Sequence, residues 1–256
     1  MTPTLFAPTV LGLAGLVVGS FLNVCIHRLP RVESLVWPGS RCPSCGAAIR
    51  WYDNVPVVGY LLLAGRCRSC HAPIALRYPI VELATMGVFV THFWTIGWEP
   101  LLVVRIAFGC ALIVLFAIDL EHQILPNAVT LPGLVVGLAA SLWLPPGWRS
   151  AWLGAVIGGG SLWLLFEIWL RLRGVEALGM GDVKMLAMVG AFLGWQQVIA
   201  TLVLSSFMGS VVGVALIAAG RGSLGSKLPY GTFIALGAMA SSLVGEPLVQ
   251  WYLSFY

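Results

Sequence analysis

Charged residues are scarce in this chain, and their scarcity excludes most classes of protein. Of 256 residues, 9% are charged and 59% are apolar, whereas about 25% of the residues of a typical soluble domain are charged. A soluble fold of this size cannot bury so much apolar surface, which excludes a water-soluble enzyme and a nucleic-acid binder. Disorder is excluded as well, because disordered segments combine low hydrophobicity with high charge. The composition indicates a membrane protein.

Polar stretches are also few, and the uncharged stretches between them have the length of membrane spans. A bilayer core about 30 Å thick requires roughly 20 apolar residues per helix. The sequence shows no low-complexity tract and no clear repeat. We predict an all-α polytopic membrane protein with about eight transmembrane helices, at 5–27, 80–98, 101–119, 127–144, 151–170, 183–194, 198–220 and 231–253.

Lysine and arginine are unevenly distributed among the predicted loops. Most of the 14 basic residues lie in one alternating set of loops, above all in 28–79. Because basic residues accumulate in cytoplasmic loops, this loop is expected in the cytoplasm and both chain termini in the periplasm. The expected organisation is a first transmembrane helix (1–27), a cytoplasmic domain (28–79) and a transmembrane domain of about seven helices (80–256).

Four of the six cysteines form two Cys-x-x-Cys pairs within 28–79, and these are Cys42, Cys45, Cys67 and Cys70. Two such pairs suit a closed tetrahedral Zn²⁺ site, which is structural because it leaves no open position for catalysis. Two disulfides are the alternative, which a reducing cytoplasm disfavours. His71 could replace one ligand, although four cysteines already fill the site. We predict a zinc-binding domain that the metal holds together.

Only ten acidic residues are present, and carboxylates at membrane depth are functional candidates by default. Asp182 stands in Gly179-Met180-Gly181-Asp182-Val183-Lys184, before an apolar helix. A helix N-cap is one interpretation of Asp182. However, a helix from 183 to the turn at Gly194 would be only about 18 Å long, too short to cross the core. Asp182 is therefore expected below the membrane surface, where Gly179 and Gly181 allow another backbone to come close.

Asp119 ends the predicted third helix, on the same side of the membrane as Asp182. An interface carboxylate that marks a helix end is the simpler interpretation. The alternative is a pair of aspartates that shares a proton, in which one partner activates water and the other donates to a peptide carbonyl. Lys184 could help to keep one aspartate ionised. From these residues alone, an aspartic protease and a transporter or ion pathway both stay open.

Taken together, the motifs resemble those of the type IV prepilin peptidases, bacterial members of the GxGD membrane aspartic proteases. The resemblance spans nearly the whole chain. Its motifs are Gly19-Ser20-Phe21-Leu22-Asn23-Val24, His27-Arg28-Leu29-Pro30, the two Cys-x-x-Cys pairs, Arg77-Tyr78-Pro79-Ile80-Val81-Glu82, Asp119 with Leu125-Pro126, Gly179–Lys184 and Pro229-Tyr230-Gly231. The chain departs from the pattern at Thr232, where many relatives carry a second proline, but this change removes no catalytic group.

The resemblance implies two activities in the bacterial inner membrane. The first is cleavage of the leader peptide of type IV prepilins or type II pseudopilins at the cytoplasmic face. The second is methylation of the new N-terminus with S-adenosylmethionine. It assigns the catalytic roles to Asp119 and Asp182 and the metal to the four cysteines. The expected partners are the pilin precursors and the lipid bilayer, with no nucleic acid.

The methyltransferase site is the least defined of these expectations, because no Gly-rich dinucleotide fingerprint follows a strand. Glu82 could hold the substrate's ammonium group or a ribose, or it could simply be a carboxylate favoured by a helix N-terminus. Two alternatives to the bifunctional enzyme remain: a peptidase that does not methylate, and a non-enzymatic transporter or scaffold.

Overall fold

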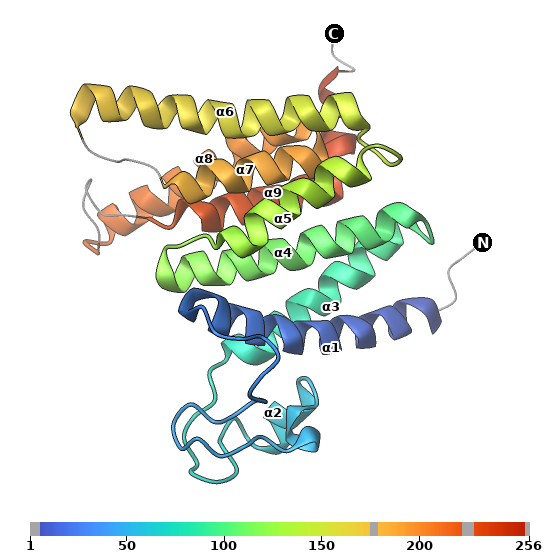
Figure 1. The fold of residues 1–256 in the computed structure, drawn as a ribbon, viewed down its shortest axis with the longest axis vertical. Coiled ribbons are helices and arrows are strands. Elements are labelled where there is room, and N and C mark those ends of the chain that lie inside the picture. The colour runs from blue at the N-terminus through green and yellow to red at the C-terminus, as the bar shows by residue number, and fades with distance from the viewer. Residues whose placement is uncertain (1–5, 175–178, 222–227, 254–256) are drawn as a thin grey trace. The chain divides into compact units, whose positions relative to one another are not determined.

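The computed structural model describes residues 6–174, 179–221 and 228–253, whose regular elements are helices, with irregular loops within 32–76 (Figure 1). Their only β-structure is two isolated bridges. The chain divides into two compact units, Met1–Leu102 and Val103–Tyr256. The helices are α1 (Phe6–Arg28), the short α2 (Val58–Leu62), α3 (Arg77–Ile96), α4 (Pro100–His122), α5 (Asn127–Ala140), α6 (Trp148–Arg173), α7 (Met180–Leu193), α8 (Trp195–Ala218) and α9 (Tyr230–Leu253).

Each of the eight helices predicted from the uncharged stretches has a counterpart, and in six of them an end differs by three or four residues. The second predicted helix begins at Arg77 rather than at 80, and the sixth begins at Met180 rather than at 183. The fourth ends at Ala140 rather than at 144. Pro145 and Pro146 follow this end, and proline lacks the N–H group that a continuing helix would need.

Among the described residues, five helices are long and apolar enough to cross a membrane: Phe6–Arg31, Arg77–Ile96, Pro100–His122, Trp148–Leu172 and Trp195–Ala218. This confirms an all-helical, multi-pass membrane protein. By contrast, α5 and α7 have 14 residues each, which corresponds to about 21 Å of helix. Eight complete crossings therefore stay a prediction.

In the first unit, α1 and α3 pack closely along a row of glycines. A Cβ atom on Gly15 would lie 2.7 Å from Met86 Cα, and one on Gly19 would lie 2.7 Å from Glu82 Cα. Farther along, Asn23 Nδ2 donates to Tyr78 O at 3.1 Å. Contacts therefore move toward the start of α3 as α1 proceeds, so the two helices are antiparallel.

In the second unit, the core packs α4 against α7 and α9. Its fully buried members include Phe108, Leu112 and Leu115 of α4, Met185 and Leu186 of α7, and Ile234 of α9. The rings of Phe108 and Phe192 are stacked with their centroids 4.6 Å apart. Lys184, near the start of α7, donates to Asn127, which begins α5 only five residues after the end of α4, so the end of α4 and the start of α7 lie at the same end of this core.

The backbones of α6 and α7 touch at a pair of glycines. A Cβ atom on Gly190 would lie 2.1 Å from Gly154 O, and one on Gly154 would lie 2.4 Å from Gly190 O. No real Cβ atom tolerates such distances from a carbonyl oxygen, so both positions require glycine. This contact fixes α7, which carries Asp182, against the longer helix α6.

Candidate active site

Asp119 lies in the last turn of α4, and only 4% of its surface is exposed. Its Oδ2 atom accepts two hydrogen bonds from one residue of α9, from Thr232 N at 2.7 Å and from Thr232 Oγ1 at 3.0 Å. Thr232 is the third residue of α9, so its N–H group is one of those that a helix leaves without an intrahelical partner. The start of α9 therefore orients the Asp119 carboxylate.

Asp182 is buried to a similar degree, with 8% of its surface exposed. It is the third residue of α7, and Gly179 is the N-cap, so the interpretation of Asp182 as the N-cap was wrong. Its Oδ2 atom accepts a hydrogen bond from Gly179 N at 3.2 Å, while Asp182 N donates to Gly179 O at 3.0 Å. This reciprocal pair holds the carboxylate at the start of its own helix.

The fold brings the two aspartates to one place. From the stacked rings, Asp119 lies 11 residues farther along α4 and Asp182 lies 10 residues back along α7. At 1.5 Å per residue these offsets are about 16 Å and about 15 Å, so both carboxylates reach the same level. The Asp119 carboxylate is close enough to act electrostatically on Asp182. The assignment of these two aspartates as a catalytic pair stays a prediction.

Leu125 packs between the two helix starts that bear on the aspartates. A Cβ atom on Gly181 would lie 2.9 Å from Leu125 Cβ, and one on Gly231 would lie 2.9 Å from Leu125 Cδ1. The Gly231 Cβ would also lie 3.0 Å from Asp119 Oδ2. Thus the two glycines make room for one leucine side chain, and this leucine sets the spacing between α7 and α9 beside the carboxylates.

Lys184 is directed to a neighbouring helix. Its Nζ atom donates to Asn127 Oδ1, the first residue of α5, at 2.9 Å. The structure thus accounts for Lys184 as a link between α5 and α7. Of the three residues expected to support the aspartates, Gly179 and Gly181 are in direct contact with the site through Asp182 and Leu125.

The second group of expected ligands lies in the first unit. The ligand atoms of Cys42, Cys45, Cys67 and Cys70 lie within 4.8 Å of one another, all four cysteines are free, and Cys42 Sγ lies 3.9 Å from Cys70 Sγ. Four sulfurs at about 2.3 Å from a tetrahedral zinc would be about 3.8 Å apart, so the residues fit a metal. Backbone N–H groups of Cys45 and Ser44 lower the pKa of the Cys42 thiol to about 6, which favours the thiolate that a metal binds.

The two cysteine pairs form a structural repeat, which contradicts the expectation of no repeat. Arg41-Cys-Pro-Ser-Cys-Gly-Ala-Ala-Ile49 corresponds to Arg66-Cys-Arg-Ser-Cys-His-Ala-Pro-Ile74. Each forms one antiparallel bridge, Arg41 to Ala48 and Arg66 to Pro73. Each also has a left-handed residue after its second cysteine, Gly46 with φ +70° and His71 with φ +57°. His71 therefore occupies a turn position and is exposed.

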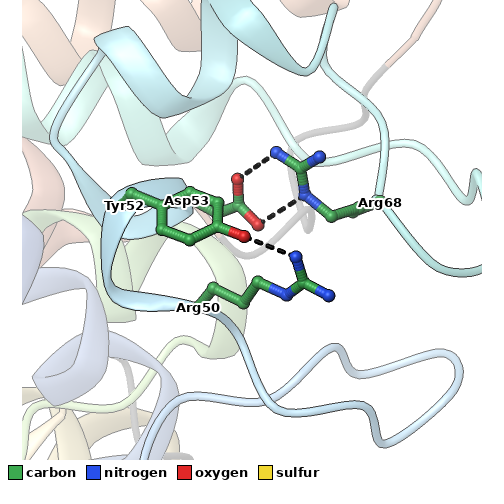
Figure 2. Close-up of polar contacts among 4 residues, drawn as sticks. All are labelled: Arg50, Tyr52, Asp53 and Arg68. Carbon is green, nitrogen blue, oxygen red and sulfur yellow. Dashed lines mark hydrogen bonds and ion pairs between the residues drawn. The ribbon is translucent and has the colours of Figure 1, made fainter.

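An ion pair clamps the second cysteine turn to the segment before α2. Arg68 donates two hydrogen bonds to the Asp53 carboxylate, of 2.8 Å from Nε and 2.6 Å from an Nη atom (Figure 2). The hydrogen bonds and charge of Arg68 hold the pKa of Asp53 below its usual range. Arg50 donates to Tyr52 Oη at 2.5 Å, and the guanidinium groups of Arg50 and Arg68 both lie over the Tyr52 ring.

Glu82 is buried in the second turn of α3. A carboxylate gains from the helix dipole only in the first turn of a helix. Because α3 begins at Arg77, Glu82 lies beyond that turn. Its Oε2 atom accepts a hydrogen bond from Val57 N at 2.7 Å, and the Ser20 side chain also bonds to it. The structure therefore gives Glu82 a role in holding the polar loop to α3.

Sequence reasoning missed two residues of this site. Thr232 was noted only as a departure from a pattern, although it donates twice to Asp119. Leu125 was noted only as part of a motif, although it separates Gly181 from Gly231. The available signal was the Gly231-Thr232 pair at the start of an apolar helix, which matches the Gly181-Asp182 pair.

Comparison with known proteins finds two family models that match this chain. A model of the bacterial peptidase A24 N-terminal domain matches residues 13–96, and a model of the type IV leader peptidase family matches residues 106–214. The chain belongs to the type IV leader peptidase family. The first match contains the four cysteines and Glu82, and the second contains both aspartates, so the expected resemblance to this family is confirmed.

Several curated relatives are called prepilin leader peptidase/N-methyltransferase. The one from Pseudomonas aeruginosa is 37% identical over 95% of this chain and 92% of its own length. The one from Burkholderia pseudomallei (strain 1026b) is 36% identical over 91% of this chain and 84% of its own. The one from Myxococcus xanthus is 43% identical over 81% of this chain and 62% of its own. No solved structure gives a significant match.

Proposed function

We propose that this member of the leader peptidase family is a bifunctional membrane enzyme, which removes the leader peptide of type IV prepilins or type II pseudopilins and then methylates the new N-terminus. The family and the names of its relatives support both activities. The observation that carries the peptidase activity is the convergence of Asp119 and Asp182 around Leu125, where the first turns of α7 and α9 meet the end of α4.

The two aspartates divide the acid and base roles of peptide hydrolysis. Asp119 Oδ2 receives two hydrogen bonds and Asp182 Oδ2 receives one, and hydrogen bonds to a carboxylate stabilise its charged form. Asp119 is therefore assigned the base, which takes a proton from water as the water oxygen attacks the scissile carbonyl carbon. Asp182 donates its proton to the carbonyl oxygen. As the C–N bond breaks, the proton held by Asp119 passes to the leaving amine, and Asp182 takes back its proton from the hydroxyl group as the carbonyl re-forms.

Methylation requires a methyl donor, and S-adenosylmethionine would supply the methyl group to the new α-amino group. Glu82 is the candidate for contacting that amine, since it is a buried carboxylate of the first unit. Its hydrogen bond with Val57 N–H is a structural role in addition. No other residue is assigned to the donor.

The four cysteines are proposed to hold a structural Zn²⁺ ion. Their number, free thiols and mutual distances support a closed four-sulfur site. The loop around them lacks a core of its own, and a metal stabilises small domains of this kind. The proposed setting is the bacterial inner membrane, with 28–79 as a cytoplasmic domain, the aspartates facing the cytoplasm and both chain termini in the periplasm.

The test uses the purified full-length chain, a purified prepilin and mass spectrometry of the products. Wild-type protein should release the leader and, with S-adenosylmethionine, add one methyl group to the new N-terminus. Asp119→Asn and Asp182→Asn should each still bind prepilin and lose cleavage, while methylating a supplied mature pilin. Wild-type cleavage in either variant would refute the aspartate pair. Cleavage without methylation would leave a peptidase alone.

The metal has a separate test. Metal analysis of the purified chain should find one equivalent of zinc, and Cys67→Ser should lower its content and its thermal stability. Ser44→Ala, in the first cysteine turn, is the control that should keep the metal. A chain with intact thiols and no bound metal would contradict the proposal.

A further inference from the structure

The polar loop contains a segment that is not polar. Residues 54–65 carry no charge, and within them Val55-Pro-Val-Val-Gly-Tyr-Leu-Leu-Leu63 contains α2. We call Val55–Leu63 the apolar segment. Its side chains face outward: the exposed fractions are 49% for Val58, 68% for Leu61 and 78% for Leu62. Neighbouring apolar patches of this kind mark surfaces that contact a partner or a membrane.

A hydrogen bond fixes the depth of the apolar segment relative to a membrane span. Val57 N donates to Glu82 Oε2 at 2.7 Å, and Glu82 is the sixth residue of α3. At 1.5 Å per residue, Glu82 lies about 8 Å beyond the start of α3. The 20 residues of α3 span about 30 Å, the thickness of the hydrocarbon core. The start of α2 thus lies level with the second turn of a spanning helix.

The surroundings at this level are those of a lipid-facing surface. Ile80 and Leu83, on either side of Glu82 in α3, are large apolar residues with exposed fractions of 59% and 45%. The backbone at Val57 is strained, because its φ of +61° is a value that β-branched residues rarely adopt. The hydrogen bond from Val57 N to Glu82 helps to hold this conformation. Such strain persists only where the surrounding structure imposes it, so the position of α2 at this depth is a built feature.

Positive charges flank the apolar segment. Arg50 lies before it and Arg66 and Arg68 lie after it, and all three are exposed. The guanidinium groups of Arg50 and Arg68 both lie near the Tyr52 ring (Figure 2). The exposed Trp51 ring packs edge-on against Tyr52. A short apolar surface with basic and aromatic residues at its edge fits the boundary between acyl chains and anionic headgroups.

We propose that the apolar segment is an interfacial membrane anchor, which inserts Val58, Leu61 and Leu62 at the acyl–headgroup boundary while the exposed Arg50 and Arg66 bind anionic lipid headgroups. The cysteine turns carry the opposite chemistry: their exposed positions include Ser44, Ser69 and Arg41. They face water, and the Asp53–Arg68 ion pair connects them to the anchor. The loop is then attached to the bilayer at a third point, between the ends of α1 and α3.

The experiment is photocrosslinking of the full-length chain in liposomes of phosphatidylethanolamine with a minority of phosphatidylglycerol. The first variant carries p-benzoylphenylalanine in place of Leu62. A second variant carries it in place of Val58, in case the first fails to fold. The matched control carries it in place of Ser69, in the second cysteine turn. After irradiation, mass spectrometry of the peptides identifies the adducts. We expect lipid adducts at positions 58 and 62 and no lipid adducts at position 69.

Each other outcome counts against the proposal. Lipid adducts that are equal at 62 and 69, or absent at both 58 and 62, would overturn the anchor. Crosslinks from position 62 to a second copy of the chain, or to added prepilin, would show a protein-binding surface instead. Phosphatidylglycerol should be enriched among the adducts above its share of the lipid, and adducts in simple proportion to the mixture would overturn the role of the arginines.

Discussion

The first turns of α7 and α9 are alike in sequence and in packing, but they hold the two aspartates differently. Each has glycine at its second position, Gly181 or Gly231, and both glycines pack against Leu125. The third residue of α7 is Asp182 itself, which bonds within its own turn. The third residue of α9 is Thr232, which donates to Asp119, 113 residues away in sequence. One carboxylate is positioned locally and the other by tertiary contact.

The comparison predicts unequal sensitivity to an added methyl group, and the largest effect is expected at Gly231. In Gly231→Ala the new Cβ would lie 3.0 Å from Asp119 Oδ2 and 2.9 Å from Leu125 Cδ1. The carboxylate or α9 must shift, and a displacement near 1 Å costs about a hundredfold in rate. We expect such a loss in kcat/KM for prepilin cleavage.

Gly179→Ala is the counterpart at the other aspartate. Its Cβ would meet Asp182 Oδ2 at 3.3 Å, and the φ of −79° is ordinary for alanine. The loss of kcat/KM in Gly179→Ala should therefore be smaller than the loss in Gly231→Ala. Gly160→Ala on α6, where a Cβ meets nothing within 4 Å, should leave cleavage unchanged. A larger loss at Gly179 than at Gly231 would reverse the comparison.

Thr232→Val tests the tertiary hydrogen bonds with an intermediate effect. Valine keeps the backbone N–H donor to Asp119 and removes the Oγ1 donor at 3.0 Å. A hydrogen bond to a charged group contributes about 1.5 kcal/mol or more, which corresponds to about a tenfold lower kcat. KM should stay constant because the Thr232 side chain bonds to the carboxylate of Asp119, which belongs to the enzyme. Thr232→Ser should restore the rate, and failure of this rescue would contradict the assignment.

Lys184→Met should have the smallest effect. Lys184 lies two residues after Asp182, yet it bonds to Asn127 Oδ1, a contact that contributes about 1 kcal/mol to stability. Thermal unfolding should therefore shift slightly downward, while cleavage per folded molecule stays near the wild-type rate. A loss comparable to that of Asp182→Asn would instead show that Lys184 keeps an aspartate ionised.

Much of the fold could be predicted because the apolar runs are long. Uncharged stretches located every long helix, and Asp119 and Asp182 stood out because the whole chain has only ten acidic residues. The start of α7 was placed too late because Gly179-Met180-Gly181 resembles a loop, whereas Gly179 caps a helix that already contains Gly181. As a result, Asp182 was considered an N-cap when it is the third helical residue.

The features that sequence could not supply depend on distant contacts. Nothing near Asp119 indicates that Thr232 donates to it, because the two residues meet only when α4 and α9 are packed. Likewise, only the fold shows that Glu82 bonds to Val57 across the loop. The repeat of the cysteine turns was different: it was visible in the sequence, but His71 in place of Gly46 and the differing residues between the cysteines obscured it.

The contact between Gly154 and Gly190 bears on how the chain assembles after it enters the bilayer. Lipid tails are as apolar as the side chains that face them, so helices associate in lipid through close packing of small residues. Insertion depends on the hydropathy of each helix by itself, which a bulkier residue at either position would not lower. With a bulkier apolar residue at either position, α6 would still insert, but α7 could not pack closely against it. The defect would therefore appear as rapid degradation of a correctly targeted protein.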